Sequence, residues 1–331
     1  MKKILIVRLG AIGDVIHTSS LFRAIKRLEP DIEVHYLVSK LIKPLLSADK
    51  DISKVIETPK KFNLFSYETF KLIKQLKQEN YSFAFNLQPS LKTRIVLLLA
   101  GIKKQYIYKK TFKQHAVINF WQTGLKAFPN LEKPLDLKLY LPEETLQKAK
   151  ERLKNLKRPL IVLNAGGMLS KRQGRAYPIN KWLDLGAKLS EKFGGAIIIT
   201  GAEEDKEMLM PLSKLNNAVN YSGRLSLEDS FAVISQTDLM ISGDSGPLHA
   251  ACALGVKSIG LYGSMPADRT GCFCSGINII SKKACAPCNK RKCRYLKGSD
   301  KIYAPCMEEI SSDEIFETAA ALLENYSAQN K

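Results

Sequence analysis

The strongest constraint on the fold is a local unit that occurs twice: an apolar strand, a glycine-containing turn and the start of a helix. The first copy leads from the strand Lys3–Val7 into a G-x-x-G turn and a helical pattern. The second leads from the apolar run Leu239–Ile241 through Ser242–Pro247 into the helix-forming segment Leu248–Leu254. The first N–H groups of a helix lack intrahelical acceptors and lie at the positive end of the helix dipole, so such a turn is typical of an anion-binding site.

Strand and helix patterns alternate along the remaining chain. Apolar runs predict strands at residues 34–38, 83–87, 135–141, 160–163, 196–200 and 258–261. Helices are predicted at residues 15–28, 70–77, 93–100, 143–156, 181–193, 205–215, 227–236 and 312–325. This alternation indicates parallel sheets with crossover helices, and 331 residues suffice for two cores. The predicted fold class is α/β, with two doubly wound, Rossmann-like domains facing a central cleft.

The domain boundary is predicted at the pair Arg158–Pro159, where a new apolar strand begins. We expect an N-terminal domain at residues 1–157 and a C-terminal domain at 158–311. The last segment, 312–331, is predicted to be a helix that packs back on the N-terminal domain.

The charge of the chain is unevenly distributed. The net charge is +19, and residues 1–155 carry 29 Lys and Arg against 14 Asp and Glu, whereas residues 156–331 carry 22 against 18. A basic field favours anionic partners such as a phosphorylated glycolipid, an acidic membrane surface or nucleic acid. The lysines are spread over many elements and form no arginine-rich stripe, so we expect no nucleic acid as partner. No run of 18 apolar residues is present, which predicts a cytoplasmic protein.

The glycine turn and the basic charge also bear on two other classes of function. Gly10 and Gly13 lack the third glycine of the dinucleotide fingerprint, which disfavours a nicotinamide-dependent oxidoreductase. A non-catalytic, basic nucleic-acid-binding protein stays open as an alternative. It predicts binding with a steep salt dependence that an Asp14→Ala substitution leaves unchanged.

Three blocks of sequence resemble the lipopolysaccharide heptosyltransferases, glycosyltransferase family nine, which have the GT-B fold. They are ILIVRLGAIGDVIHT near the N-terminus, SLEDSFAVISQTDLMISGDSGPLHAACALGVKSIGLYGSMPADRTG, and CAPCNKRKC followed by Cys306–Met307. The resemblance implies transfer of L-glycero-D-manno-heptose from ADP-heptose to the Kdo/heptose inner core of lipopolysaccharide, with inversion at the anomeric carbon. A transferase of the same fold with a different nucleotide-sugar donor is the alternative.

The resemblance places the catalytic base at Asp14 in the N-terminal, acceptor-binding domain. An inverting transfer needs one base to take the proton of the attacking hydroxyl, and a carboxylate becomes effective as the new bond makes that proton acidic. The alternative is that Asp14 only caps the helix that follows it. His17, one turn further on, is expected to pack or bond locally.

The resemblance also implies a donor site in the C-terminal domain. A helix N-terminus with a fixed cation can stabilise a leaving pyrophosphate without metal, so no cofactor is expected to be required. Arg175 stands where the family pattern usually has Lys, and Pro247 has no N–H to donate. The donor contacts implied by the resemblance are Gly166, Gly167, Arg175, Glu203, Leu225, Asp244, Ser245, Gly246, Pro247, Leu248 and His249.

The acceptor implied by the resemblance is an anionic glycolipid of the lipid A–Kdo type at the inner face of the cytoplasmic membrane, so peripheral membrane association is expected. Lys92 matches the family's Q-G-x-x-K pattern, with Pro89 in place of the glycine. Lys60, Lys61 and Arg94 are further candidate acceptor contacts.

Four of the seven cysteines, Cys285, Cys288, Cys293 and Cys306, are spaced C-x2-C-x4-C-x12-C. Close pairs in a cytoplasmic protein suggest a structural metal or an iron–sulfur site, but the spacing is not a standard zinc pattern. We favour reduced packing thiols and expect no metal. Asp49-Lys50-Asp51 matches the D-x-D metal motif of other glycosyltransferases, but it lies in a polar loop, so we discount it as a metal site.

Overall fold

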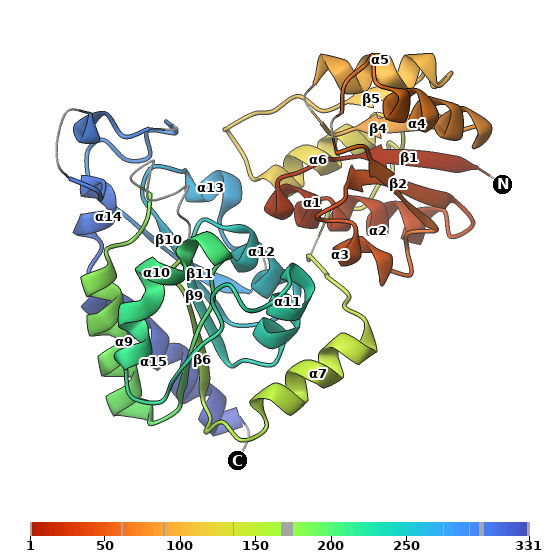
Figure 1. The fold of residues 1–331 in the computed structure, drawn as a ribbon. Coiled ribbons are helices and arrows are strands. Elements are labelled where there is room, and N and C mark those ends of the chain that lie inside the picture. The colour runs from red at the N-terminus through yellow and green to blue at the C-terminus, as the bar shows by residue number, and fades with distance from the viewer. Residues whose placement is uncertain are drawn as a thin grey trace. The chain divides into compact units, whose positions relative to one another are not determined.

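The chain forms two compact units, Met1–Leu141 and Pro142–Lys331, each built on one parallel sheet (Figure 1). The computed structural model describes residues 2–60, 62–88, 90–134, 136–166, 175–273, 275–290, 292–297 and 301–329. Within these residues, no helix has the length and apolar character needed to span a membrane.

Unit 1 contains a five-stranded parallel sheet whose central strand is the N-terminal apolar run. The strand order is β3-β2-β1-β4-β5. Ile4 on β1 pairs with Val34 on one neighbouring strand and with Phe83 on the other. The strands are β1 (Lys3–Val7), β2 (Glu33–Ser39), β3 (Lys54–Thr58), β4 (Phe83–Asn86) and β5 (Gln105–Ile107).

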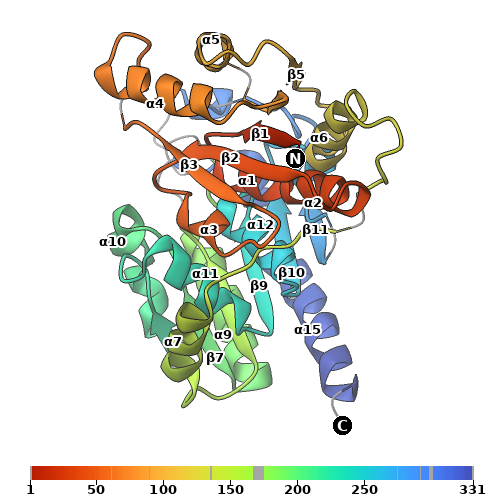
Figure 2. The same cartoon turned by 90° about the vertical axis from the view of Figure 1, so that its right-hand side faces the viewer.

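Helices cover both faces of the unit 1 sheet (Figure 2). Successive strand residues point to opposite faces, so Leu5 and Val7 pack with Leu72 of α4 and Leu97 of α5 in one core cluster. On the other face α2 contacts α6, and the ring of Phe22 meets that of Tyr36 at 6.4 Å. The helices are α1 (Ile12–His17), α2 (Ser19–Leu28), α3 (Pro44–Ser47), α4 (Tyr67–Gln78), α5 (Leu91–Leu99) and α6 (Ala116–Leu125).

Unit 2 contains a six-stranded parallel sheet in the order β11-β10-β9-β6-β7-β8. The two strands that precede the predicted donor-site segments are neighbours, since Asn164 at the end of β6 pairs with Ser242 on β9. The strands are β6 (Leu160–Asn164), β7 (Ala196–Ile199), β8 (Ala218–Asn220), β9 (Leu239–Gly243), β10 (Ser258–Tyr262) and β11 (Gly276–Ile280).

The core of unit 2 joins alternate strand residues to α9 and α15. Trp182 and Leu185 of α9 and Ile315 of α15 are buried together with Ile161 and Ile241 of the sheet. Elsewhere in this unit, α11 packs against both α7 and α12. The helices of unit 2 are α7 (Glu143–Leu153), α9 (Ile179–Phe193), α10 (Lys206–Leu209), α11 (Leu227–Ser235), α12 (Gly246–Ala253), α13 (Ala267–Thr270), α14 (Pro305–Glu309) and α15 (Ser312–Gln329).

Two parts of the predicted domain division need correction. The boundary lies after Leu141 and not after residue 157, because α7 packs on α11, and the Thr145 hydroxyl lies 2.8 Å from Glu228. The final helix α15 packs within unit 2, on α9 and the strands β9 and β10. The Lys257 ammonium also donates to the Leu322 carbonyl oxygen at 2.8 Å, so the prediction that this helix belongs with the N-terminal domain is wrong.

Three predicted elements also differ from the structure. The helix predicted at 15–28 is divided into α1 and α2 at Thr18. The described residues 136–141 form no strand, and the helix predicted at 205–215 is divided between α10 and flanking 3₁₀ turns. Pro211 lies within the second of these turns, and proline removes a backbone donor that a continuing helix would need.

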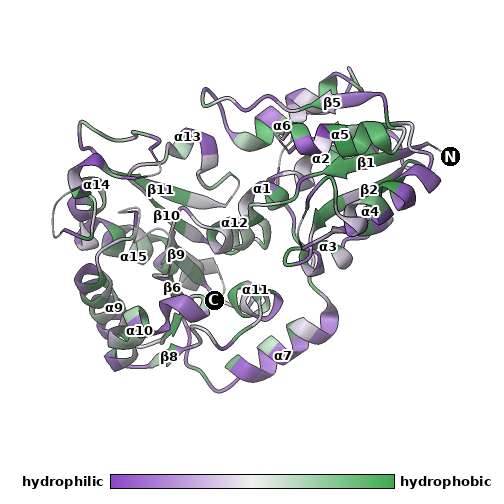
Figure 3. Ribbon diagram, turned by 45° about the horizontal axis from the view of Figure 1, so that its top comes forward, coloured by the Kyte–Doolittle hydropathy of each residue, from purple (hydrophilic) through white to green (hydrophobic). Residues whose placement is uncertain are grey.

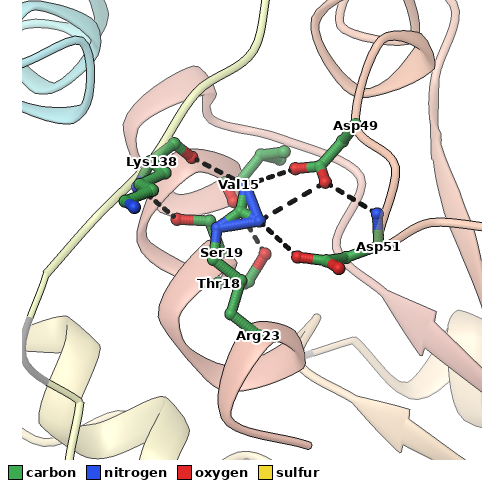
Figure 4. Close-up of polar contacts among 7 residues, drawn as sticks. All are labelled: Val15, Thr18, Ser19, Arg23, Asp49, Asp51 and Lys138. Atoms are coloured by element: carbon green, nitrogen blue, oxygen red, sulfur yellow. Dashed lines mark hydrogen bonds and ion pairs between the residues drawn. The ribbon is translucent and has the colours of Figure 1, made fainter. Parts of the chain in front are cut away.

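The D-x-D sequence of unit 1 forms a buried ionic cluster (Figure 4). The Arg23 guanidinium donates to Asp49 at 2.6 Å, to Asp51 at 2.8 Å and to the Lys138 carbonyl oxygen at 3.4 Å. It also lies over the Tyr140 ring, 4.9 Å from the centroid. These carboxylates therefore neutralise a buried arginine, and that arginine holds the segment that ends unit 1. This arrangement agrees with discounting the two carboxylates as a metal motif.

Candidate active site

The turn after β1 brings a buried arginine against the candidate base. Asp14 lies in the first turn of α1, and its carboxylate forms an ion pair with the guanidinium of Arg8. The other terminal nitrogen of Arg8 donates to the Leu87 carbonyl oxygen at 2.8 Å. The N-cap residue of α1 is Ala11, so the interaction assigned to Asp14 is with Arg8 and not with the helix cap. Arg8 is 9% exposed and Asp14 21% exposed, which leaves the carboxylate accessible from one side.

The same end of the unit 1 sheet carries a second loop. The Gln88 side-chain oxygen, after β4, accepts from the Leu9 N–H at 3.2 Å and joins the two turns. His17 is buried, with its ring 5.1 Å from that of His115, which caps α6 by accepting from the Val117 N–H. Since β1 and β4 are neighbouring parallel strands, Leu9 and Gln88 lie at their carboxyl ends, where open α/β sheets bind ligands.

Three of the four candidate acceptor residues lie among the described residues. The Lys92 ammonium donates to the Phe62 carbonyl oxygen at 2.7 Å and is exposed, as are Lys60 and Arg94. Lys61 lies outside the described residues. The assignment of these side chains to the acceptor stays a prediction.

In unit 2 the glycine-containing turn Ser242–Pro247 leads into α12, whose N-terminus is capped by a side chain. Ser245 is the N-cap of α12, and its hydroxyl oxygen accepts from the Leu248 N–H at 3.3 Å. The Asn164 amide donates to Ser242 at 2.8 Å and to Ser245 at 3.2 Å. The Thr200 hydroxyl in turn donates to the Asn164 oxygen at 3.1 Å. Side chains from β6, β9 and the end of β7 thus fix the orientation of the turn.

A pocket lies beside this turn and holds about 490 Å³ of empty space, part of it open to solvent. Four of the predicted donor residues line it: Gly166, Arg175, Asp244 and Ser245. The lining also includes Asn164 and the residues Tyr262–Met265 after β10. The remaining predicted donor residues that the structure describes, Glu203, Leu225, Gly246, Pro247, Leu248 and His249, do not line it. Gly167 lies outside the described residues.

Arg175 and Asp244 are charged side chains that line the pocket. Arg175 donates to the Lys290 carbonyl oxygen at 3.0 Å, while its buried Nε has no hydrogen-bond partner among the described residues. The imidazole Nε2 of His249, buried on α12, lies 3.4 Å from the Asp244 carboxylate. The absence of a side chain at Gly166 lets the Asp205 carboxylate pack against its backbone, because a Cβ at that position would lie 2.5 Å from the carboxylate oxygen. The pocket therefore lies beside the N-cap residue of α12 and a guanidinium, and both a helix N-terminus and a guanidinium can bind phosphate.

Residues 69–298 match the family model described as glycosyltransferase family 9 (heptosyltransferase). The chain belongs to glycosyltransferase family 9. It is 26% identical over 305 residues to lipopolysaccharide heptosyltransferase 1 of Campylobacter coli, covering 84% of this chain and 88% of that protein. It is 26% identical over 292 residues to lipooligosaccharide heptosyltransferase 2 of Haemophilus influenzae, covering 78% and 83%.

Solved structures confirm the predicted GT-B fold of this transferase. A family 9 glycosyltransferase of Veillonella parvula matches with a TM-score of 0.82 at 18% identity, over 98% of this chain and 97% of that chain. The E. coli ADP-heptose lps heptosyltransferase II matches with a TM-score of 0.78 at 19% identity, over 99% and 100%. At these identities the likeness concerns the fold.

The predicted nucleoside contacts of the transferase lie on two segments that pack on each other. Glu203 is exposed, in a 3₁₀ turn after β7, and a Cβ at Gly223 would lie 2.3 Å from its carboxylate oxygen. The Gly223 N–H donates to the Gly201 carbonyl oxygen at 3.0 Å. Leu225 follows two residues later and is half-buried. Their contact with a nucleoside stays a prediction.

The four cysteines of the C-x2-C segment meet in unit 2. Cys285, Cys288, Cys293 and Cys306 line one pocket, and all four are free thiols. Burial and the neighbouring cysteines raise the pKa of Cys306 to about 11. Across the described ranges of the transferase, no three His, Cys, Asp or Glu side chains are arranged to hold a metal ion. The alternative of a structural metal or iron–sulfur site at these four cysteines stays a prediction.

Sequence reasoning missed Arg8, Asn164 and Thr200. Each follows or ends a buried strand beside a predicted site turn, so a polar residue at the end of an apolar run was the available signal. The distant partners, Leu87 for Arg8 and Ser242 and Ser245 for Asn164, become apparent only once the strands are paired.

Proposed function

We propose that this transferase moves L-glycero-D-manno-heptose from ADP-heptose to the Kdo/heptose inner core of lipopolysaccharide, with inversion and without a metal. The observation that carries the proposal is the Ser245-capped start of α12 beside the Arg175-lined pocket, in a member of family 9. The names of the similar proteins, which refer to lipopolysaccharide and lipooligosaccharide heptosyltransferases, support the sugar and the acceptor class.

The donor would bind with its pyrophosphate at the start of α12. The positive end of the α12 dipole and the Arg175 guanidinium would oppose the charge that grows on the leaving ADP. The network from Asn164 to Ser242 and Ser245 holds this turn in place before the donor binds. Such preorganised groups make metal assistance unnecessary.

Asp14 would act as the base. As the acceptor oxygen forms its bond to the anomeric carbon, the hydroxyl proton passes to the Asp14 carboxylate, while the bond from that carbon to ADP breaks on the opposite face. The electron pair of the broken bond leaves with the diphosphate. Arg8 would act as a positioning residue, because it is anchored on the Leu87 carbonyl oxygen while it holds the carboxylate.

The acceptor would be a glycolipid of the lipid A–Kdo type that reaches the enzyme from the inner face of the cytoplasmic membrane. Its carboxylates and phosphates are complementary to the basic N-terminal half, in which Lys92 and Arg94 are exposed at the start of α5. Peripheral membrane association is part of this proposal.

The test is a reaction of purified enzyme with ADP-heptose and Kdo-lipid A in the presence of EDTA. We expect equimolar ADP release and heptosylated lipid, with inverted anomeric configuration by NMR. The Asp14→Asn variant should lose turnover and retain ADP binding within a few-fold by calorimetry. Selective binding of UDP or GDP would overturn the donor assignment in favour of another sugar, and loss of all activity with EDTA would overturn metal independence.

A further inference from the structure

An apolar surface lies on the outer side of α4 and α5 in unit 1. Its most exposed member is Phe65, at 95% of its full area, just before α4. Large apolar side chains in water are normal when single, but a contiguous group marks a site of interaction. The α4–α5 surface, as we call it, consists of the exposed residues Phe65, Tyr67, Phe70, Leu91, Leu98 and Leu99.

These side chains are not needed for the core of unit 1. The inward residues Leu72 and Leu76 of α4 and Val96 and Leu97 of α5 already form the core cluster with the sheet. In α5, Leu91 and Leu98 are seven residues apart and therefore share a helix face. This helix is hydrophobic on its outer side as well as on its inner side, and Figure 3 shows its hydrophobic residues in green. An outer helix of a unit is normally polar on the side that faces water.

Basic side chains are interspersed with the apolar ones. Lys71 and Lys74 of α4 and Lys92 and Arg94 of α5 are all exposed. Residues 60–104 carry nine Lys and Arg against two Glu. One of these acids, Glu79, is already neutralised by ion pairs with Lys3 and Lys54, which leaves Glu68 as the one acid on this stretch without an ion pair among the described residues. The surface is therefore both hydrophobic and cationic.

We propose that the α4–α5 surface docks the enzyme on an anionic lipid bilayer. Aromatic and leucine side chains would enter the level of the lipid head groups, and the lysines would lie against the lipid phosphates. A protein partner would need no cationic rim around the apolar residues, whereas an anionic bilayer is complementary to both properties. The inference rests on the proposed function in one respect: a lipid-linked acceptor gives the enzyme a membrane to work on.

The place of this surface in unit 1 agrees with that use. Helix α5 begins three residues after Gln88, whose side-chain oxygen bonds the Leu9 N–H in the turn that precedes Asp14. Docking through α5 would thus bring the turn of the candidate base to the lipid surface, where the sugars of a membrane-anchored acceptor begin.

The test measures binding of the full chain to vesicles of phosphatidylglycerol and phosphatidylethanolamine, with phosphatidylcholine vesicles as reference. We expect binding to the anionic vesicles alone. The double variant Phe65→Ser/Phe70→Ser should lower the partition coefficient roughly 10- to 100-fold, because each ring gives up contact with the apolar lipid region. The double variant Lys71→Gln/Lys74→Gln should lower it roughly 30-fold, which corresponds to about 1 kcal/mol for each lysine near an anionic surface.

Matched variants on unit 2 serve as controls. Met210→Ser removes an apolar side chain that is 56% exposed, and Lys148→Gln removes an exposed charge from α7. Both should bind vesicles like the wild type, and thermal melts should show that all variants are folded. Equal loss in the controls, unchanged binding of the α4–α5 variants, or failure of the wild type to bind anionic vesicles would each overturn the proposal.

A second readout separates this proposal from the proposed function. With an acceptor stripped of its acyl chains, the α4–α5 variants should keep wild-type turnover, while turnover on acceptor embedded in vesicles should fall with the partition coefficient. Loss with both acceptors would assign these side chains to acceptor contacts and overturn docking. Vesicle binding by an enzyme that transfers no heptose would refute the proposed function and leave docking intact.

Discussion

We expect substitution of Arg8 by lysine to slow the transfer step and leave donor binding unchanged. Arg8 uses two different terminal nitrogens, one for Asp14 and one for the Leu87 carbonyl oxygen at 2.8 Å. A lysine keeps the positive charge, but its single nitrogen cannot occupy both positions. The carboxylate then loses its fixed orientation or the buried carbonyl loses its donor.

The magnitude follows from these two contacts. An unpaired buried carbonyl costs about 1–3 kcal/mol of stability. A misplacement of about 1 Å at a reacting group can lower kcat roughly 100-fold, which corresponds to about 2.7 kcal/mol at the transition state. Since the pocket that holds the predicted donor contacts lies in unit 2, we expect the KM for ADP-heptose to stay within about twofold of the wild type.

Steady-state kinetics of ADP release, with urea unfolding in parallel, provides the assay. Arg27→Lys is the matched control, because Arg27 is also in unit 1 but 49% exposed, and it should behave like the wild type. Full kcat in Arg8→Lys would refute the positioning role. A rise in donor KM as large as the fall in kcat would also contradict the reasoning, because it would show that Arg8 acts on donor binding.

Three further predictions concern the donor turn and the stability of unit 1. Asn164→Ala should weaken ADP binding roughly tenfold by calorimetry, because Ser242 and Ser245 lose the amide donor that they share. Unchanged affinity would show that the turn keeps its conformation without Asn164. Arg23→Met should lower the free energy of unfolding by about 3 kcal/mol, since it leaves Asp49 buried without its cation, and Asp49→Asn in the same background should restore part of the loss. Hydrogen bonds from Lys3 and Lys54 lower the pKa of Glu79 from 4.5 to about 2, so its contribution is present above pH 4.5 and is lost as the pH falls toward 2. Urea unfolding should therefore show a steeper loss of stability over this interval in the wild type than in Glu79→Gln, and equal slopes would contradict the assignment.

The central strands could be predicted from sequence because their signal is local. Lys3–Val7 and Leu239–Ile241 are apolar runs, and a strand buried on both faces reads in that way whatever its neighbours are. Four strands at sheet edges were missed. The strand β3 (Lys54–Thr58) is half polar, β5 and β8 have only three residues each, and β11 (Gly276–Ile280) begins with a glycine. Their strand character depends on pairing at the sheet edge, which composition does not encode.

The predicted position of the boundary between the units was wrong for a related reason. The segment Glu143–Leu153 is strongly charged, and its apolar residues are too few to show which core it joins. Its place in unit 2 depends on contacts with α11, more than seventy residues further along the chain. A proline at residue 159 marks the start of the next strand correctly but not the change of domain.

The candidate site shows the same division between local and distant information. The turn at Ser245 is readable in the sequence because a serine N-cap followed by a proline at the second helical position is a local signature. The residues that orient this turn and the Asp14 carboxylate are separated from their partners: Asn164 lies 78 residues before Ser242, and Arg8 lies 79 residues before Leu87. A parallel sheet brings such residues together at the carboxyl ends of adjacent strands, although crossover helices separate them in sequence. A polar residue that ends a buried strand is therefore the feature to examine first in a chain of this fold, because its position is set by the sheet and its partner can come from any neighbouring strand.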